Sequence, residues 1–312
     1  MTPNDPGADF LQHIRYEKRL SHHTLIAYEN DLLQFTEFLQ EQPGNMQPAQ
    51  ADHLLVRGWI VHLVESGLNK STVNRKIATL RAFFGYLLRR KRIDTDPMQK
   101  IVTLKQSSRL PTFVEEKPME TLLDDIDFPA DFMGLRDKLV LELLYGTGIR
   151  LGELLGLKPT DINRFDRTIT VLGKRNKHRI VPLTPPLFAL IEQYEQQKAL
   201  FFDGTADATA LIVSDKGIPA YPVLIQRIVN KYLALVTSLE KRSPHVLRHT
   251  FATHLLNRGA DLNAIKDLLG HSSLAATQVY THTSLEQLKK TYEQAHPKGG
   301  GNQSSNAPAL ES

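Results

Sequence analysis

Helical periodicity is the dominant pattern in the first hundred residues. Apolar residues recur there at the three- and four-residue spacing of amphipathic helices, in the stretches 8–19, 22–41, 51–66 and 71–91. The last stretch shows the pattern most clearly, with an apolar arc made of Val73, Ile77, Leu80, Phe84, Leu87 and Leu88. We expect Ser71 to cap the start of this helix. Together the four stretches predict a compact helical bundle.

The pattern changes after residue 103. Residues 104–111 are polar and lose the periodicity, which is typical of an interdomain linker. Beyond them a buried helical stripe ends at Gly146-Thr147-Gly148. Residues 168–172 and 178–183 then alternate like two short strands, joined as a hairpin through residues 173–177. Helices are expected again at residues 185–200 and 221–237, from Pro244, from Asp261 to Leu269, and beyond Ser272 or Ser273.

These elements predict a mainly α protein with two domains. Residues 1–103 form a four-helix N-terminal domain, and residues 112–296 form an α+β domain that is helical with a small antiparallel sheet. A chain of 312 residues can bury two such cores. The tail, residues 297–312, is rich in Gly, Ser, Asn and Pro, as disordered segments are.

Composition narrows the class of protein further. Hydrophobic residues make up 41% and charged residues 23% of the chain, which is typical of soluble globular proteins. The N-terminus resembles no signal peptide, and no apolar run reaches membrane-spanning length, so we expect a cytoplasmic protein without membrane contact. The absence of cysteine excludes disulfides, thiol nucleophiles and cysteine-based metal sites.

Positive charge is concentrated in one part of the chain. The net charge is only +4, but residues 70–109 hold eleven Lys or Arg against two acids. Such a block is typical of a nucleic-acid-binding surface, and a merely solvated basic face is the alternative. The candidate DNA-binding residues on the fourth helix are Lys70, Arg75, Lys76, Arg81, Arg89 and Arg90.

The helix expected from Pro244 carries the most suggestive chemistry. Ser243 is a good N-cap, and proline suits the first helical position. His245 and Arg248 lie three residues apart, on one face near the N-terminus, where free N–H groups and the helix dipole attract anions. A guanidinium and an imidazole there suit phosphate chemistry, although a core helix with a polar edge would explain them equally well.

The same domain offers further groups for phosphoryl transfer. Two arginines can clamp the non-bridging oxygens of a phosphodiester, a phenol oxygen can attack phosphorus, and lysine and histidine can move protons. No Walker loop, acidic metal cluster or cofactor fingerprint is present, so we expect no cofactor. The candidate set is Arg150, Lys174, His245, Arg248, His271 and Tyr280.

Five motifs carry a resemblance to a known family. They are Gly146-Thr-Gly-Ile-Arg150-Leu-Gly-Glu153, Gly173-Lys174, His245-Val-Leu-Arg248-His249, Leu268-Leu-Gly-His271 and Tyr280-Thr-His282. In this order and spacing they closely resemble the tyrosine recombinases of the phage integrase family, in particular the Xer type, over nearly the whole chain.

The resemblance implies both an architecture and a reaction. Members have an N-terminal core-binding domain and a catalytic domain that needs neither metal nor nucleotide. The resemblance makes Tyr280 the nucleophile of a 3′-phosphotyrosyl link, activated by Arg150, Lys174, His245, Arg248 and His271. It implies a site-specific recombinase that acts on double-stranded DNA as a homo- or heterotetramer with a second recombinase, through a Holliday junction. Chromosome dimer resolution at cell division is the favoured task, with a cell-division DNA translocase as a candidate partner and mobile-element integration as the alternative.

One motif departs from the family pattern. The hairpin usually reads Gly-Lys-Gly, and Arg175 replaces the second glycine here. Since arginine adopts positive φ at a cost, the turn can shift toward Asn176. Whether Lys174 or Lys177 reaches the leaving group therefore stays open, with Lys174 favoured.

Other readings of the same residues remain. His245 and His249 imitate half a zinc site, which would suit a metal-dependent hydrolase. A type IB-like topoisomerase or a non-catalytic DNA-binding accessory protein would share parts of the pattern. Glu153 is either a simple helix ion pair or a support for Arg150. An apolar stripe of Leu285, Leu288 and Tyr292 either docks on a neighbouring subunit or packs on its own domain.

Overall fold

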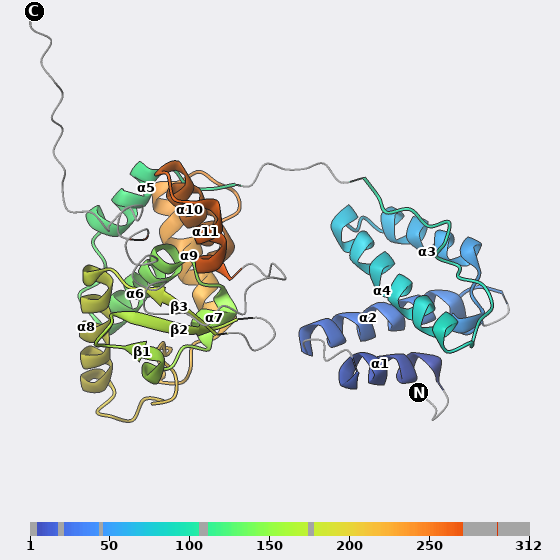
Figure 1. Ribbon diagram of the computed structural model, residues 1–312, viewed down its shortest axis with the longest axis horizontal. Coiled ribbons are helices and arrows are strands. Elements are labelled where there is room, and N and C mark those ends of the chain that lie inside the picture. Colours follow the sequence, from blue (N-terminus) through green and yellow to red (C-terminus); the bar gives the residue numbers. More distant parts are fainter. Residues whose placement is uncertain are drawn as a thin grey trace, which may run out of the picture. The chain divides into compact units, whose positions relative to one another are not determined.

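The chain divides into two compact units, Met1–Arg109 and Leu110–Ser312, in a computed structural model (Figure 1). The structure describes residues 5–17, 22–43, 46–105, 112–173, 178–270 and 292. Each unit has its own hydrophobic core, one gathered around Trp59 and the other around the helix Phe132–Thr147. None of the described helices is long and apolar enough to cross a membrane.

The first unit is the expected helical bundle. Its elements are α1 (Pro6–Tyr16), α2 (His22–Gln40), the 3₁₀ turn η1 (Pro48–Gln50), α3 (His53–Glu65) and α4 (Lys70–Arg89). The prediction that Ser71 caps the fourth helix is wrong. Asn69 has the extended backbone of an N-cap, and its side chain accepts a hydrogen bond of 2.8 Å from the backbone N–H of Thr72.

A buried carboxylate holds α2 against α4. Asp31 accepts hydrogen bonds from Arg75, from Lys76 at 2.8 Å and from Thr79 at 2.8 Å. The side chain of Lys76 is only 4% exposed, and its ammonium also donates to Gln34. Because an unpaired buried charge is costly, each of these partners stabilises the other. Lys76 therefore belongs to the interior of the bundle, contrary to the expectation that it contacts DNA.

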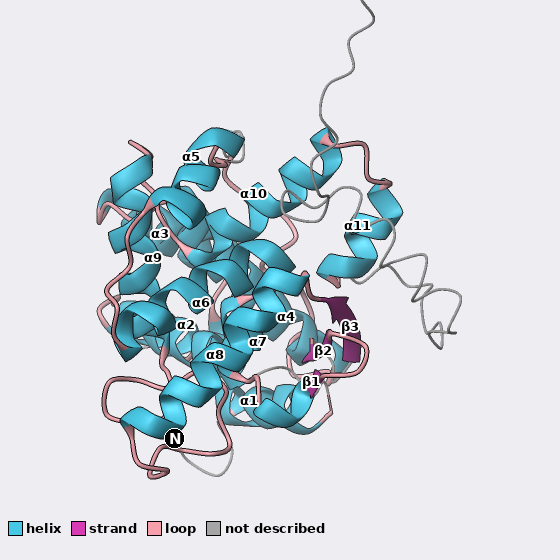
Figure 2. Cartoon of the chain, turned by 90° about the vertical axis from the view of Figure 1, so that its left-hand side faces the viewer, coloured by secondary structure: helices cyan, strands magenta, loops and turns pink. Residues whose placement is uncertain are grey.

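The second unit is mainly helical with a small sheet (Figure 2). This confirms the predicted fold class. The elements are α5 (Glu116–Glu120), the π-helical turn η2 (Thr121–Asp125), α6 (Phe132–Thr147), α7 (Leu151–Leu155), the 3₁₀ turn η3 (Pro159–Asp161), β1 (Ile162–Asn163), β2 (Thr168–Leu172), β3 (His178–Pro182), α8 (Pro185–Phe201), α9 (Pro222–Val236), α10 (Pro244–Asn257) and α11 (Leu262–Leu269).

The sheet contains the expected hairpin. Its strands are antiparallel in the order β1-β2-β3, with Ile169 opposite Val181 and Val171 opposite Arg179. Side chains alternate along a strand, so Arg179 lies on the same face as the buried Val181. The sequence did not predict β1, because two residues are too few to show an alternation.

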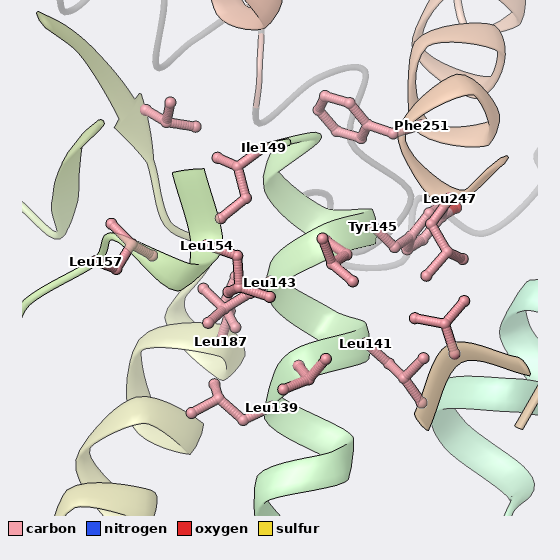
Figure 3. Close-up of a cluster of buried hydrophobic side chains, with 14 of the residues drawn as sticks. Leu139, Leu141, Leu143, Tyr145, Ile149, Leu154, Leu157, Leu187, Leu247 and Phe251 are labelled. Carbon is pink, nitrogen blue, oxygen red and sulfur yellow. The ribbon is translucent and has the colours of Figure 1, made fainter. Parts of the chain in front are cut away.

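Helix α6 is the centre of the second core. Leu139, Leu141, Leu143 and Tyr145 point from it in different directions, and Leu247 and Phe251 of α10 approach it from one side (Figure 3). The helix ends at Gly148, which has a φ of +60°. A Cβ atom at Gly148 would lie 2.4 Å from the Phe251 ring and 2.8 Å from Leu269. The turn therefore brings the end of α6 directly against α10 and Leu269 of α11.

Candidate active site

Two of the predicted site residues lie in the first turns of α10. The helix begins at Pro244, as expected, and the preceding Ser243 has an extended backbone. The Ser243 hydroxyl makes no capping hydrogen bond and has no partner among the described residues. Ser243 is therefore at the predicted N-cap position, but the prediction that its side chain caps the helix is wrong. His245 is exposed, whereas Arg248, one turn later, is buried.

Arg248 lies at the junction of α6 and α11. Its Nη1 donates to the carbonyl of Gly148, and its Nη2 donates to the carbonyl of Leu269 at 2.6 Å. Burial lowers the pKa of the Arg248 guanidinium to about 10, and the charge of Arg150 acts in the same direction. Arg248 is still a cation at neutral pH, and its two carbonyl partners fix its orientation.

Arg150 occupies the N-cap position of α7. Its backbone N–H and its Nη1 each donate to the Glu153 carboxylate at 2.7 Å, and its Nη2 donates to the carbonyl of Gly270 at 3.3 Å. The Arg150 side chain is 30% exposed, so its guanidinium remains open to a ligand on one side. Glu153 is thus both a helix ion pair and a support that orients Arg150, which joins the two readings of that residue.

A third arginine completes the pairing of Glu153. Arg179 of β3 donates from Nη1 and Nη2 to the two Glu153 oxygens at 2.9 and 2.8 Å. Burial alone would raise the pKa of Glu153, but the hydrogen bonds from Arg179 and Arg150 outweigh it and hold the pKa at about 2. The sequence reasoning missed Arg179. Its place two residues before Val181, on the same inward-facing side of the strand, was a signal for a buried ion pair.

The low pKa of Glu153 makes the free energy of unfolding depend on pH in the acid range. The folded pKa of Glu153, about 2, is below its ordinary 4.5, so the stabilisation is complete above about pH 4.5 and is lost as the pH falls toward 2. We expect the wild-type chain to lose about 2 kcal/mol more unfolding free energy between pH 5 and pH 3 than Glu153→Gln does. Urea unfolding followed by circular dichroism measures this, and parallel losses in both proteins would contradict it.

The remaining histidines of α10 differ in their surroundings. Burial and the charge of His245 lower the pKa of the half-buried His249. His254 is buried, its Nδ1 lies 2.9 Å from the Tyr145 hydroxyl, and burial lowers its pKa as well. Within the ranges that the structure describes, no group of three or more His, Asp or Glu side chains could hold a metal ion.

Several predicted residues lie outside the described part of the chain: Lys174, Arg175, Asn176, Lys177, His271, Tyr280, Leu285 and Leu288. Residues next to some of them are described. Gly270, which directly precedes His271, is the carbonyl partner of Arg150. The structure therefore brings together Arg150 and Arg248, with His245 on the helix of Arg248, around the end of α11.

Tyr292 is described and packs in the core of its own unit. It is only 1% exposed, and its hydroxyl donates a hydrogen bond to the carbonyl of Gly146. Its ring centroid lies 6.5 Å from that of Phe251. Of the two alternatives for the apolar stripe, Tyr292 therefore follows the one in which the stripe packs on its own domain.

The other candidate cations of α4 lie at the surface. Arg75 pairs with Asp31, Arg81 donates to the carbonyl of Ile101, and Arg90 pairs with Glu17. Lys70 and Arg89 are exposed at the two ends of the helix. Five of the six candidate DNA-binding residues are therefore accessible to a phosphate, and Lys76 is not.

Solved structures with similar folds are recombinases and integrases. The XerH site-specific recombinase bound to palindromic difH substrate matches with a TM-score of 0.68 and 23% identity, over 92% of this chain and 84% of that one. The Tn1549 transposon integrase in complex with transposon right end DNA matches with a TM-score of 0.68 and 20% identity, over 92% and 98%. At these identities the matches establish the shared fold.

Sequence comparison identifies the family. The model of the phage integrase family matches residues 112–287, and that of the phage integrase N-terminal SAM-like domain matches residues 8–91. The tyrosine recombinase XerC of Pelobacter propionicus is 40% identical over 290 residues, covering 93% of this chain and 94% of the relative. XerC of Chlorobaculum parvum is 36% identical over 312 residues, covering 92% and 93%. The chain therefore belongs to the phage integrase family of tyrosine recombinases and is similar to its XerC members, which confirms the resemblance of the five motifs.

Proposed function

We propose that this protein is a site-specific DNA recombinase that cuts and rejoins DNA through a covalent 3′-phosphotyrosyl intermediate. The observation that carries the proposal is the pair of guanidinium groups, Arg150 and Arg248, held at the end of α11 by carbonyl and carboxylate partners. Fixed cations stabilise developing charge strongly because they need no reorganisation during the reaction.

The proposed cleavage exchanges one phosphodiester for another. The phenol oxygen of Tyr280 attacks phosphorus, the bond from phosphorus to the 5′-oxygen breaks, and DNA keeps a 3′-phosphotyrosyl end. Arg150 and Arg248 donate to the non-bridging oxygens, whose negative charge grows in the transition state. His245 and His271 orient the phosphate and accept the phenol proton. Lys174, or Lys177 in its place, protonates the departing 5′-oxygen.

Rejoining reverses these steps with a different strand. The 5′-hydroxyl of a second duplex attacks the phosphotyrosine, so the bond energy is retained and no nucleotide is consumed. A complete exchange needs four active sites on two duplexes. We propose a tetramer of this chain, alone or with a second recombinase, and chromosome dimer resolution at cell division as its task, supported by the similarity to XerC proteins.

Covalent capture tests the reaction. The full chain is incubated with sheared genomic DNA of its source organism in excess chelator, denatured in detergent, and the attached DNA is sequenced. We expect adducts at one short sequence. Failure to form any adduct would contradict the proposal. DNA cleavage that leaves no adduct and appears only when a divalent metal replaces the chelator would favour the metal-dependent hydrolase. Relaxation of plasmids that lack the captured sequence would favour a topoisomerase.

The captured sequence also separates the two biological tasks. A single chromosomal site shared by related strains supports dimer resolution. A site at the ends of a mobile element would instead support an integrase, the activity named for the Tn1549 protein of similar fold.

Exposed cations of α4 should make binding sensitive to salt. Each phosphate contact releases counterions, so the logarithm of the affinity falls linearly with the logarithm of salt concentration. We expect Lys70→Gln combined with Arg89→Gln to weaken binding and to reduce this slope by about 2. Fluorescence anisotropy with a labelled duplex measures both. Arg164→Gln, which removes an exposed arginine paired with Glu195, serves as the control and should leave the slope unchanged.

A further inference from the structure

Three consecutive carbonyl groups at the end of α11 each accept a hydrogen bond from a different arginine. Arg179 Nε donates to Leu268 at 2.8 Å, Arg248 Nη2 to Leu269 at 2.6 Å and Arg150 Nη2 to Gly270 at 3.3 Å. The last four carbonyls of a helix have no partner within the helix, and its C-terminus favours positive charge. The three guanidinium groups meet both requirements at once.

Arg179 differs from Arg150 and Arg248 in how fully its guanidinium is hydrogen-bonded. It is 6% exposed, about as buried as Arg248, but its Nε, Nη1 and Nη2 all donate to partners within the unit, whereas the hydrogen bonds of Arg248 within the described ranges come from Nη1 and Nη2. A residue in this position does not reach a phosphate. It instead joins three elements: β3, which carries it, α7 through Glu153, and α11 through Leu268.

Packing reinforces these hydrogen bonds. Gly270 ends α11 with a φ of +63°, and a Cβ atom there would lie 3.2 Å from both Cδ and Nη1 of Arg179. Gly270, where α11 ends, therefore lies directly against the Arg179 side chain. A displacement of Arg179 would be transmitted to Gly270 and, through Glu153, to Arg150.

We propose that Arg179 is a positioning residue for DNA cleavage: through Glu153 and the carbonyl of Leu268 it orients Arg150 and the end of α11. This inference rests on the proposed function. A bidentate guanidinium pair fixes direction as well as charge, and lysine, a point charge, does not reproduce it. Residues that orient the ligands of metal sites change affinity or activity by about 10- to 100-fold, and we expect an effect of similar size from a residue that orients Arg150.

Arg179→Lys and Arg179→Met test the role. The rate of adduct formation is measured in a single turnover on a nicked suicide duplex that carries the captured sequence, in excess chelator. Temperature is set well below the melting point of each variant. We expect the rate to fall about 10- to 100-fold in Arg179→Lys and further in Arg179→Met, while the Kd for DNA changes less than about threefold.

Arg136→Lys is the matched control. Arg136 is also buried in the same unit, and it is hydrogen-bonded to Asp137 through Nε and Nη2. In the described part of the chain its hydrogen bonds go to Asp137 and to neither Glu153 nor α11. We expect this variant to melt at a lower temperature and to cleave at the wild-type rate. Slowing equal to that of Arg179→Lys would show that lost stability alone explains the defect.

A double variant tests the route of the effect. If Arg179 acts through Glu153, the rate losses of Arg179→Lys and Glu153→Gln overlap. The fold-loss of the double variant is then smaller than the product of the two single fold-losses. Losses that multiply, or an Arg179→Lys rate equal to the wild type, would overturn the inference. A wild-type chain that forms no adduct on any DNA would overturn the proposed function itself, so the two failures are distinguishable.

Discussion

Tyr280→Phe is expected to form no detectable covalent adduct on the suicide duplex, while binding that duplex as tightly as the wild-type chain does. The substitution removes only the oxygen that is proposed to bond to phosphorus and keeps the aromatic ring. Loss of a nucleophile costs a rate factor on the order of 10⁵ or more. Denaturing gels measure the adduct, and fluorescence anisotropy measures the affinity for DNA.

Tyr292→Phe is the matched control for this experiment. It makes the same chemical change at a tyrosine whose hydroxyl donates to the carbonyl of Gly146 and whose pKa is raised by burial. We expect a loss of about 1 kcal/mol in stability and unchanged adduct formation. An adduct that persists in Tyr280→Phe would disprove the assignment, and peptide mass spectrometry of the adduct would identify the true nucleophile.

Long periodic elements of the fold could be predicted from the sequence, and short ones could not. Helix α4 and the β2–β3 hairpin could be predicted because many of their apolar side chains recur on the same face at a regular spacing. Helix α5 and strand β1 span five and two residues, too few for a pattern. Ser71 does not cap α4 because Asn69, two residues earlier, takes the N-cap position and accepts the hydrogen bond from a free N–H group. Ser243 holds the predicted N-cap position of α10 but makes no capping hydrogen bond.

The candidate site shows a similar division. Motif order identified Arg150 and Arg248. Their convergence depends on the left-handed turn at Gly148, where the sequence predicted only the end of a helical stripe. Charge counting failed at Lys76 and overlooked Arg179, since a count does not show which cations are paired in the interior. Each of these two cations pairs with a buried carboxylate on another element, Lys76 with Asp31 and Arg179 with Glu153. The identity of the partner is set by tertiary contacts. The local pattern shows at most that Arg179 lies on the inward-facing side of β3.

Arg248→Lys is expected to slow adduct formation by about 10³-fold. Arg248 already donates to the carbonyls of Gly148 and Leu269, so only a guanidinium has further N–H groups to offer a phosphate in a fixed direction. Lysine keeps the positive charge but reaches fewer of these acceptors at once. Removing one fixed donor to a transition-state oxyanion costs about 10²- to 10³-fold, and arginines in phosphoryl transfer contribute more.

Arg258→Lys is the control for this substitution, because Arg258 lies at the C-terminal end of the same helix. Arg258 follows α10 and pairs with Glu116 through Nε and Nη2 at 3.1 Å each, at the surface and without a carbonyl of α11 as partner. Arg258→Lys removes two guanidinium hydrogen bonds, as Arg248→Lys does, so equal slowing would mean that any disturbed arginine near α10 impairs the enzyme. A fall of tenfold or less in the rate of adduct formation by Arg248→Lys would contradict the proposal that Arg248 holds the non-bridging oxygens of the phosphodiester. A loss near 10³-fold, with Arg258→Lys unchanged, would show that the geometry of one buried guanidinium, beyond its charge, carries the cleavage step.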